Sequence, residues 1–282
     1  MQTKPGLYIV STPIGNLNDI SLRAIDTLKS SSVVFCEDTR VSQKLLEKHK
    51  INTILKVYND NSDVQTRGFV KSLITQGKVV SLVSDAGTPL ISDPGYKLVR
   101  ELRNSGLHVD IIPGPSALIA ALTLSGLPTD KFYFAGFIPK TTLGKEKLFS
   151  SLIQLNCSLI FYDTSPRIVD SLEVAFKIFG NRLANVSREL TKLYQESNTK
   201  TLSELIEYYQ LYPPRGEIVF IIDGRDVNEI SIEELEQDIS KLIKHGISAK
   251  SASDKVFKRC GDKISRKEIY KIANKVKRSD KD

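Results

Sequence analysis

The chain has 282 residues, of which 40% are hydrophobic and 26% are charged, and its formal net charge is +7. This composition is typical of a globular protein and argues against low-complexity disorder, while the length favours two domains with a small appendage. The three cysteines are scattered and include no C-x-x-C pair. That pattern argues against a disulfide framework and a structural zinc site, and it predicts a reducing, cytoplasmic environment. The opening MQTKPGLYIV has no long apolar stretch behind a basic start, so we expect no secretory signal.

Short apolar runs alternate with amphipathic stretches over the first 115 residues. The runs are rich in β-branched residues and predict five strands, at Leu7–Ser11, Val33–Glu37, Ile54–Tyr58, Val79–Ser84 and Val109–Pro113. The stretches between them predict four helices, at Asp19–Ser30, Arg40–Lys50, Val64–Gln76 and Tyr96–Ser105. This alternation indicates an N-terminal α/β lobe, residues 1–115, with a parallel sheet covered by helices on both faces.

The uncharged segment from Ile111 to Thr129 resembles a membrane span at first sight. Proline and glycine break both of its ends, and its helical part, about Ala117–Ser125, is far shorter than the roughly 20 residues that a span needs. We therefore expect a buried core helix and no membrane association. The Pro-Gly-Pro corner at 113–115 marks the first predicted domain boundary.

A second α/β lobe is predicted over residues 116–226. Its expected strands are Phe132–Phe137, Ser158–Asp163, Asn185–Glu189 and Glu217–Asp223. Its expected helices are Glu146–Gln154, Ile168–Phe179 and Leu202–Tyr209. The last strand, EIVFIID, is strongly β-branched and closes this lobe.

Residues 230–282 form a third, basic region. Its pattern predicts three short helices, Ile232–His245, Ala249–Cys260 and Arg266–Lys277, with Gly246 and Gly261 as C-terminal caps. This size fits a helix-turn-helix-like tail, although any small bundle gives the same pattern. Residues 241–282 hold 14 basic and 5 acidic residues, whereas the first 240 residues hold 26 basic and 28 acidic ones. So localised a surplus predicts a polyanion-binding surface, and a solvated helical tail is the alternative.

In an open parallel sheet, ligands bind at the carboxyl ends of the strands. The loops expected there are 11–19, 37–40, 59–63, 84–95 and 113–117, and four of the five are rich in Gly, Pro, Asp, Ser or Thr. The loops at the opposite edge, 31–32, 52–53, 77–78 and 106–108, are short and plain. Because turns alone do not need such a density of these residues at one edge, the asymmetry predicts a ligand site there.

The common nucleotide-binding motifs are absent from these loops. No two glycines are closer than eight residues, so the chain has neither a G-x-G-x-x-G fingerprint nor a phosphate-binding P-loop. This argues against NAD oxidoreduction and ATP hydrolysis by the common routes. None of His49, His108 and His245 lies in the crevice loops, so we expect surface or capping histidines, no His-centred triad and no metal site.

Charged residues in the crevice loops include Glu37, Asp38, Arg40, Asp60, Asp85 and Asp93. Taken singly, Asp beside Gly often forms only an Asx turn, and the stretch 37–40 could simply cap a helix with a local ion pair. Asp85 is the strongest candidate for ligand contact, because Ser84-Asp85-Ala86-Gly87 follows a central buried strand and points into the crevice.

Seven blocks of sequence, taken together, resemble one known family. They are LYIVSTPIGNLNDIS, CEDTR, LVSDAGTPLISDPG, PGPSALIAAL, FAGFIP, SRELTK and RGEIVFIIDG, in family order over about residues 5–225. The combination resembles the ribosomal RNA small subunit methyltransferase I family of the tetrapyrrole methylase superfamily. The resemblance implies a two-lobed α/β fold, with a parallel five-stranded N-lobe, a mixed-sheet C-lobe and a small C-terminal helical domain. It further implies S-adenosylmethionine as cofactor, 2′-O-methylation of a cytidine in the decoding region of 16S rRNA or the small ribosomal subunit, and a homodimer.

The resemblance also implies roles for individual positions. Those expected around the cofactor are Pro13, Gly15, Asp85, Ala86, Gly87, Thr88, Pro89, Pro113, Gly114, Pro115, Ser116, Tyr162 and Gly216. Those expected to face the acceptor, and therefore the candidate catalytic residues, are Glu37, Asp38, Arg40, Glu189 and Lys192. Alignment of two bound reactants can lower a barrier by roughly 7–11 kcal/mol. We therefore expect positioning to dominate catalysis, with a carboxylate or Lys192 assisting deprotonation.

The sequence departs from the family pattern at two histidine positions. The run 58–62 reads YNDNS and the block 162–167 reads YDTSPR, each without the histidine that the family commonly has. We interpret those histidines as groups that position RNA rather than as bases. Two rival functions are a methyltransferase of the same superfamily acting on a tetrapyrrole, and a non-catalytic ribosome-binding protein. The basic tail with EDTR and SRELTK argues against the first, and the intact turns 85–89 and 113–116 argue against the second.

Overall fold

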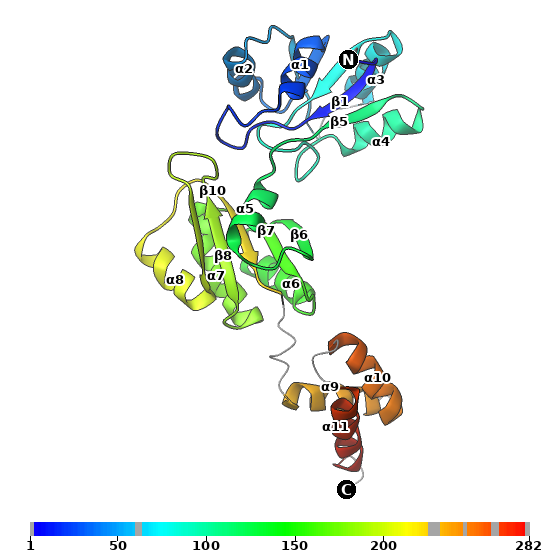
Figure 1. Ribbon diagram of the computed structural model, residues 1–282, viewed down its shortest axis with the longest axis vertical. Helices are drawn as coiled ribbons and strands as arrows, with labels where there is room; N and C mark the ends of the chain where they lie inside the picture. Colours follow the sequence, from blue (N-terminus) through cyan, green and yellow to red (C-terminus); the bar gives the residue numbers. More distant parts are fainter. Residues whose placement is uncertain (1–2, 60–63, 225–231, 245–246, 261–264, 280–282) are drawn as a thin grey trace.

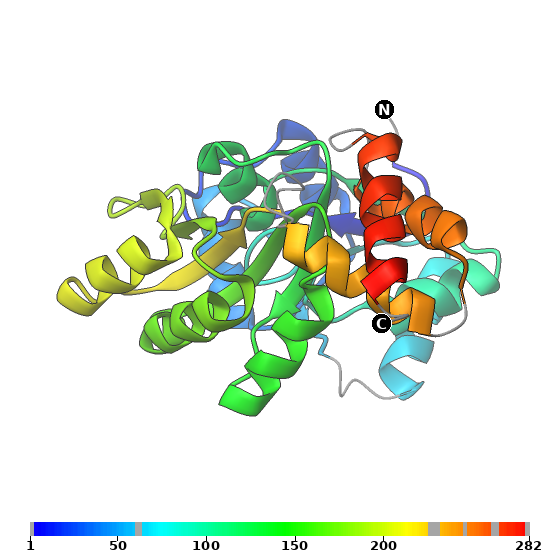
Figure 2. The ribbon, with the colours of Figure 1, turned by 90° about the horizontal axis from the view of Figure 1, so that it is seen from below.

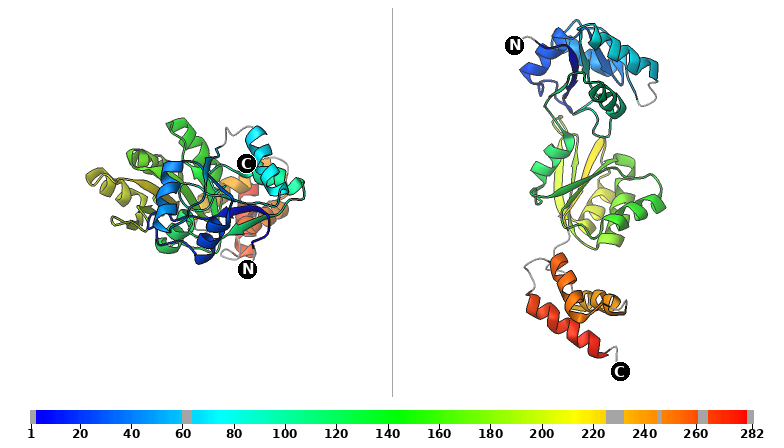
Figure 3. Two further views of the ribbon diagram at one scale, coloured as in Figure 1. Left: turned by 90° about the horizontal axis from the view of Figure 1, so that it is seen from above. Right: turned by 90° about the vertical axis from the view of Figure 1, so that its right-hand side faces the viewer.

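The computed structural model describes residues 3–59, 64–224, 232–244, 247–260 and 265–279. Along the chain it has two α/β lobes and then a bundle of three helices, arranged in a row with the second lobe in the middle (Figures 1 and 3). The expected α/β fold class is thereby confirmed. Within the described residues, no helix is both long and apolar enough to cross a membrane.

The first lobe is built on a five-stranded parallel sheet with the strand order β3-β2-β4-β1-β5. Its strands are β1 (Gly6–Val10), β2 (Val33–Cys36), β3 (Leu55–Val57), β4 (Val79–Leu82) and β5 (Val109–Ile112). Its helices are α1 (Leu22–Ser30), α2 (Thr39–Lys48), α3 (Val64–Thr75) and α4 (Tyr96–Asn104). Every residue of β1 and β2 is buried, as expected for strands covered on both faces.

Two hydrophobic cores cover the two faces of this sheet. Phe35 and Leu82 pack with α3 and α4 on one face, while Val10 and Val34 pack with α1 and α2 on the other. The strands alternate their side chains between faces, so neighbours such as Val34 and Phe35 belong to different cores. Helices on both faces are therefore confirmed.

Helix α1 begins three residues later than the sequence pattern indicated. Ser21 is its N-cap, with its hydroxyl accepting a hydrogen bond from the Ala24 N–H. The backbone before it makes a turn in which the Asp19 N–H donates to Asn16 O. A serine at the cap position satisfies one of the free N–H groups of the first turn, and this outweighs the apolar spacing that favoured a start at Asp19.

The second lobe is built on a mixed five-stranded sheet with the order β6-β7-β10-β8-β9, in which only β6 and β7 pair in parallel. Its strands are β6 (Phe132–Phe137), β7 (Ser158–Thr164), β8 (Leu183–Arg188), β9 (Glu196–Thr201) and β10 (Glu217–Ile222). Its helices are α5 (Ala117–Ser125), α6 (Thr142–Leu152), η1 (Ser165–Arg167), α7 (Ile168–Phe179) and α8 (Leu202–Leu211). Helices α6, α7 and α8 cover one face of the sheet, and α5 covers the face nearer the first lobe (Figure 1).

Three features of this lobe correct the sequence predictions. Strand β9, ESNTKT, was not predicted, because it contains no apolar residue; it pairs at the edge with β8, where the buried Asn185 amide donates to Ser197 and Thr199. The predicted start of α6 at Glu146 was wrong, because the Thr141 hydroxyl accepts from the Gly144 N–H and caps the helix four residues earlier. Helix α5 occupies the predicted span but is buried along one side only, since Leu124 is 51% exposed.

The C-terminal helices are α9 (Ile232–Lys244), α10 (Ala249–Cys260) and α11 (Arg266–Ser279). They share a small core of their own around Leu235, Ile239, Val256, Ile269 and Ala273, and they lie on the side of the second lobe away from the first (Figures 1 and 2). The capping glycines 246 and 261, together with residues 60 and 245, lie outside the described residues. The domain boundaries at 115 and 226 stay predictions.

Candidate active site

A cavity of about 250 Å³ lies between the two lobes. Its wall on the first lobe comes from the loops that follow β1, β2, β4 and β5, that is, from the carboxyl edge of the parallel sheet. Its wall on the second lobe comes from β6, β7, β8 and β10 and from the residues that follow β8. Predicted site residues that line it are Glu37, Asp85, Ala86, Gly87, Thr88, Ser116, Tyr162, Glu189 and Lys192.

Three crevice loops of the first lobe are joined by short hydrogen bonds. Thr12 and Gly87 form an antiparallel bridge, with N···O distances of 2.8 and 3.1 Å. The Thr88 hydroxyl donates to Pro115 O at 3.0 Å and lies 3.0 Å from the Ser11 hydroxyl. Gly87 has φ +80°, a conformation that costs glycine little. The 84–89 turn is therefore held in place before any ligand binds.

The stretch 37–40 divides into two roles. Asp38 caps α2, since its carboxylate accepts from the Arg40 N–H at 2.8 Å and from the Arg40 guanidinium at 2.5 Å. The hydrogen bond from the Arg40 side chain lowers the pKa of Asp38 to about 2. Asp38 and Arg40 therefore form a helix cap and a local ion pair, whereas Glu37 lines the cavity. The Asp38 N–H also donates to the Asp85 carboxylate at 3.0 Å, joining this stretch to the 84–89 turn.

The second lobe contributes a carboxylate–ammonium pair. Lys192 Nζ lies 3.0 Å from Glu189 Oε1, and both residues line the cavity. Gly216 lies against this pair, because a Cβ there would collide with the Glu189 carboxylate. Gly15, in the first lobe, lies equally close to Lys192, since a Cβ on Gly15 would lie 2.6 Å from Lys192 Cγ. Neither glycine lines the cavity itself, and both leave room for the residues predicted to face the acceptor.

Two of the remaining predicted positions, Gly114 and Pro115, support the wall from behind. Pro115 accepts the hydrogen bond from Thr88, and Gly114 packs against Ser11, where a Cβ would lie 2.9 Å from the serine Cβ. Those not among the lining residues are Pro13, Gly15, Asp38, Arg40, Pro89, Pro113, Gly114, Pro115 and Gly216.

Several lining residues were not predicted from the sequence. Phe137 packs edge-on against Tyr162, with ring centroids 5.3 Å apart, and burial raises the pKa of Tyr162 to about 12. Leu90 and Ser92 adopt φ values of +75° and +66° beside the cavity, a conformation that is uncommon for residues other than glycine. Lining residues outside the predicted set are Ile14, Ile91, Ser92, Asp93, Ala117, Phe137, Asp163, Thr164, Ser187, Leu190, Glu217, Ile218 and Val219. The FAGFIP block was the signal for Phe137, although no role was drawn from it.

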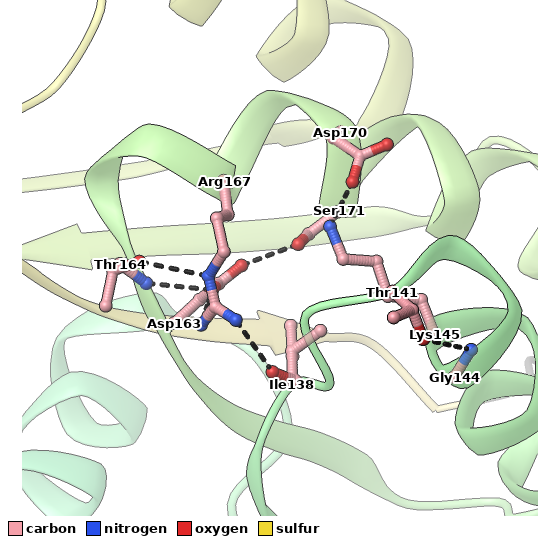
Figure 4. Close-up of polar contacts among 9 residues, drawn as sticks. All are labelled: Ile138, Thr141, Gly144, Lys145, Asp163, Thr164, Arg167, Asp170 and Ser171. Atoms are coloured by element: carbon pink, nitrogen blue, oxygen red, sulfur yellow. Dashed lines mark hydrogen bonds and ion pairs between the residues drawn. The ribbon is translucent and has the colours of Figure 1, made fainter.

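Behind the Tyr162 wall lies a polar network, drawn in Figure 4. The Asp163 side chain is fully buried; Arg167 Nη2 lies 2.7 Å from its Oδ1, and the Ser171 hydroxyl donates to its Oδ2 at 2.6 Å. Arg167 also donates to Thr164 Oγ1 at 3.1 Å and to Ile138 O at 3.3 Å (Figure 4). This network fixes the end of β7 to the segment after β6, on which the cavity wall depends.

The cavity is rich in carboxylates. Acidic residues among its lining are Glu37, Asp85, Asp93, Glu189 and Glu217, together with Asp163, whose buried carboxylate pairs with Arg167, whereas Lys192 is the one basic residue in that lining. Lys192 pairs with Glu189. An acidic, partly apolar cavity favours a ligand that carries positive charge and disfavours phosphate. Within the part of the chain that the structure describes, no cluster of three or more His, Cys, Asp or Glu could hold a metal ion.

The sequence profile of the Tetrapyrrole (Corrin/Porphyrin) Methylases matches residues 6–206, which span both lobes. The chain belongs to the tetrapyrrole methylase family. A diphthine synthase structure shares the fold of this tetrapyrrole methylase, with a TM-score of 0.60 over 77% of this chain and 89% of that one, at 13% identity.

Two curated relatives extend the comparison. This tetrapyrrole methylase is 52% identical to a ribosomal RNA small subunit methyltransferase I of Rickettsia prowazekii, over 98% of this chain and 99% of that one. It is 40% identical to a protein of the same name from Thermotoga maritima, over 78% of this chain and 99% of that one. The family resemblance stated from the sequence blocks is confirmed. Almost all of the Thermotoga protein thus matches only 220 residues of this chain.

Proposed function

We propose that this protein transfers a methyl group from S-adenosylmethionine to the 2′-hydroxyl of a cytidine in the decoding region of 16S rRNA. The observation that carries the proposal is the cavity between the lobes, where the 85–88 turn faces the Glu189–Lys192 pair. The relatives named ribosomal RNA small subunit methyltransferase I support RNA of the small subunit as the acceptor. The same resemblance supports a cytoplasmic homodimer.

The cavity fits S-adenosylmethionine in shape and charge. The small residues Ala86 and Gly87 leave space in the cavity, and Ile14, Leu190 and Val219 provide apolar surface. The cofactor carries a sulfonium and an ammonium, so the lining carboxylates stabilise it. When bound, it supplies an electrophilic methyl group on sulfur. Held turns such as 84–89 reduce the ordering that binding requires.

The ribose hydroxyl is bound and deprotonated by three side chains, Glu37, Glu189 and Lys192. Glu189 holds the Lys192 ammonium at 3.0 Å, so Lys192 donates a hydrogen bond to the 2′-oxygen from a fixed position. The Glu37 carboxylate, on the facing lobe, accepts the 2′-hydroxyl proton as the oxygen attacks. The acidic lining keeps the RNA phosphates outside, which leaves the ribose as the group that enters. Positioning of the two reactants supplies most of the rate enhancement.

The proposal is tested by incubating the protein with labelled S-adenosylmethionine and small ribosomal subunits and mapping the labelled nucleotide. We expect one cytidine, labelled on its ribose. Glu37→Gln should slow single-turnover transfer at saturating cofactor and subunits, whereas Glu47→Gln, an exposed glutamate on α2, should not. Label on a base, or on a tetrapyrrole but not on RNA, would refute the proposed acceptor. An unchanged rate for Glu37→Gln would refute its role as the base.

A further inference from the structure

The turn between β8 and β9 carries two exposed apolar side chains at its tip. Leu193 is 88% exposed and Tyr194 is 72% exposed. Among the large apolar side chains of the described residues, Leu193 is the most exposed. A single apolar side chain on the surface needs no explanation, but two neighbouring ones at the tip of a held turn offer an apolar surface that a partner can contact.

The backbone beneath this tip is held by its own hydrogen bonds. The Lys192 N–H donates to Glu189 O at 3.0 Å, and the Gln195 N–H donates to Lys192 O at 3.1 Å. The Thr191 N–H donates to the Gln195 side chain at 2.6 Å. Glu189 and Thr191 have φ values of +49° and +63°, and such backbone strain persists only where the surroundings enforce it, often at functional sites. The exposure of the tip is therefore a property of a held turn.

The tip lies at the rim of the cavity. Lys192, immediately before Leu193, lines the cavity. Across the gap between the lobes, the Asn16 N–H donates to Thr191 Oγ1 at 2.9 Å, and Gly15 approaches the same segment. Both contacts fix the turn against the first lobe, so Leu193 and Tyr194 project outward beside the entrance.

We propose that Leu193 and Tyr194 form a stacking platform for a nucleobase of the RNA substrate, next to the ribose whose hydroxyl enters the cavity. This inference rests on the proposed function. A ribose reaches an interior cavity only when its nucleotide leaves the RNA stack, and proteins hold such unstacked bases on aromatic side chains. The acidic lining excludes the phosphates, so the base and the backbone stay at the rim, where the tip lies.

Replacement of the ring tests the platform on the full-length protein. Base–aromatic stacking contributes an amount that corresponds to an affinity loss of about 5- to 150-fold on truncation to alanine. Tyr194→Ala should therefore raise the concentration of small ribosomal subunits that gives half-maximal single-turnover rate by about that factor. Tyr194→Phe should keep the wild-type value, since it keeps the ring. Both variants should bind S-adenosylmethionine as the wild type does. The matched control is Tyr212→Ala, at a tyrosine that is 63% exposed at the end of α8.

The chain contains no tryptophan, which provides a direct spectroscopic test. Tyr194→Trp introduces a single tryptophan, and its fluorescence should be quenched by subunits as a base stacks on it, whereas Tyr212→Trp should not respond. Equal quenching at both positions, or an unchanged half-maximal concentration for Tyr194→Ala, overturns the platform. A lower sedimentation mass for Tyr194→Ala also overturns it, because the tip would then be a contact between copies of the chain. Failure of the wild type to bind the cofactor or to methylate subunits overturns the proposed function instead.

Discussion

Arg167 neutralises a carboxylate that has no access to water. The Asp163 side chain is 0% exposed, and its ion pair with Arg167 spans 2.7 Å (Figure 4). Arg167→Met keeps the length of the side chain but removes the charge, and breaking a buried pair on one side costs about 3–5 kcal/mol. The Ser171 hydroxyl and the Thr164 N–H still donate to the carboxylate. We therefore expect a loss near the lower end, about 3 kcal/mol.

The double variant Asp163→Asn/Arg167→Met leaves no buried charge unpaired. We expect it to lose only about 1 kcal/mol, in the range of one net hydrogen bond, so the two substitutions should be strongly non-additive. The matched control is Lys177→Met on α7, the helix that follows Arg167. Lys177 is 72% exposed in its pair with Glu146, and exposed ion pairs contribute about 0–1 kcal/mol.

Hydrogen exchange measured by mass spectrometry reports the local opening free energy of β7 and α7 in the full-length protein. Cofactor affinity should fall in parallel for Arg167→Met, because Asp163 and Thr164 line the cavity. Two results would show that burial of Asp163 does not depend on Arg167. One is a loss of opening free energy below about 1 kcal/mol for Arg167→Met. The other is a loss in the double variant equal to the sum of the losses in Asp163→Asn and Arg167→Met.

Three further outcomes are expected. The pKa of Asp38 is lowered from 3.8 to about 2, chiefly by the hydrogen bond from the Arg40 side chain, so its stabilising contribution is complete above pH 4 and disappears as the pH falls towards 2. In Arg40→Met, carboxyl-carbon NMR should show Asp38 titrating at a higher pH than in the wild type. Gly15→Ala should lower the free energy of unfolding by about 1–3 kcal/mol and slow methylation, because its Cβ would lie within 2.7 Å of three atoms of the second lobe. The control is Gly68→Ala, which should not destabilise the protein, since a Cβ there has nothing within 4 Å. Equal behaviour of the two variants would contradict this reasoning. Deletion of residues 230–282 should weaken RNA binding and flatten its salt dependence without changing cofactor affinity, since basic side chains release counterions from phosphate; equal RNA affinity of the truncated protein at moderate salt would contradict it.

The first lobe was predictable because its signals are local. Strands buried on both faces read as continuous apolar runs, and Val33–Cys36 needs no knowledge of the partner strand to be recognised. Strand β9 has no such local signal, because its own side chains are polar. It is held in the sheet by its hydrogen bonds to β8 and by the side-chain amide of Asn185. The start of α6 depended on a single cap, Thr141, placed before a stretch of weak helical pattern.

The candidate site likewise has one wall that the sequence could predict and one that it could not. The wall on the first lobe comes from loops at one sheet edge, and strand order alone locates such loops. The wall on the second lobe includes Ser187, Ile218 and Val219, which lie within antiparallel strands and carry no loop signature. Leu90 and Thr191 adopt positive φ angles. No local sequence rule indicates them, because these side chains do not favour that conformation.

Under the proposed function, the two opposite charge surpluses of the chain would serve different parts of the substrate. An acidic cavity favours a cationic methyl donor and disfavours phosphate, so we expect it to admit the ribose and to keep the RNA backbone outside. We expect the basic surplus of residues 241–282 to attract that backbone; the helices of this region share a separate core. Almost the whole Thermotoga relative matches 220 residues of this chain. Separation of the charges into different units lets RNA attraction increase without weakening the cavity's preference for a cationic donor.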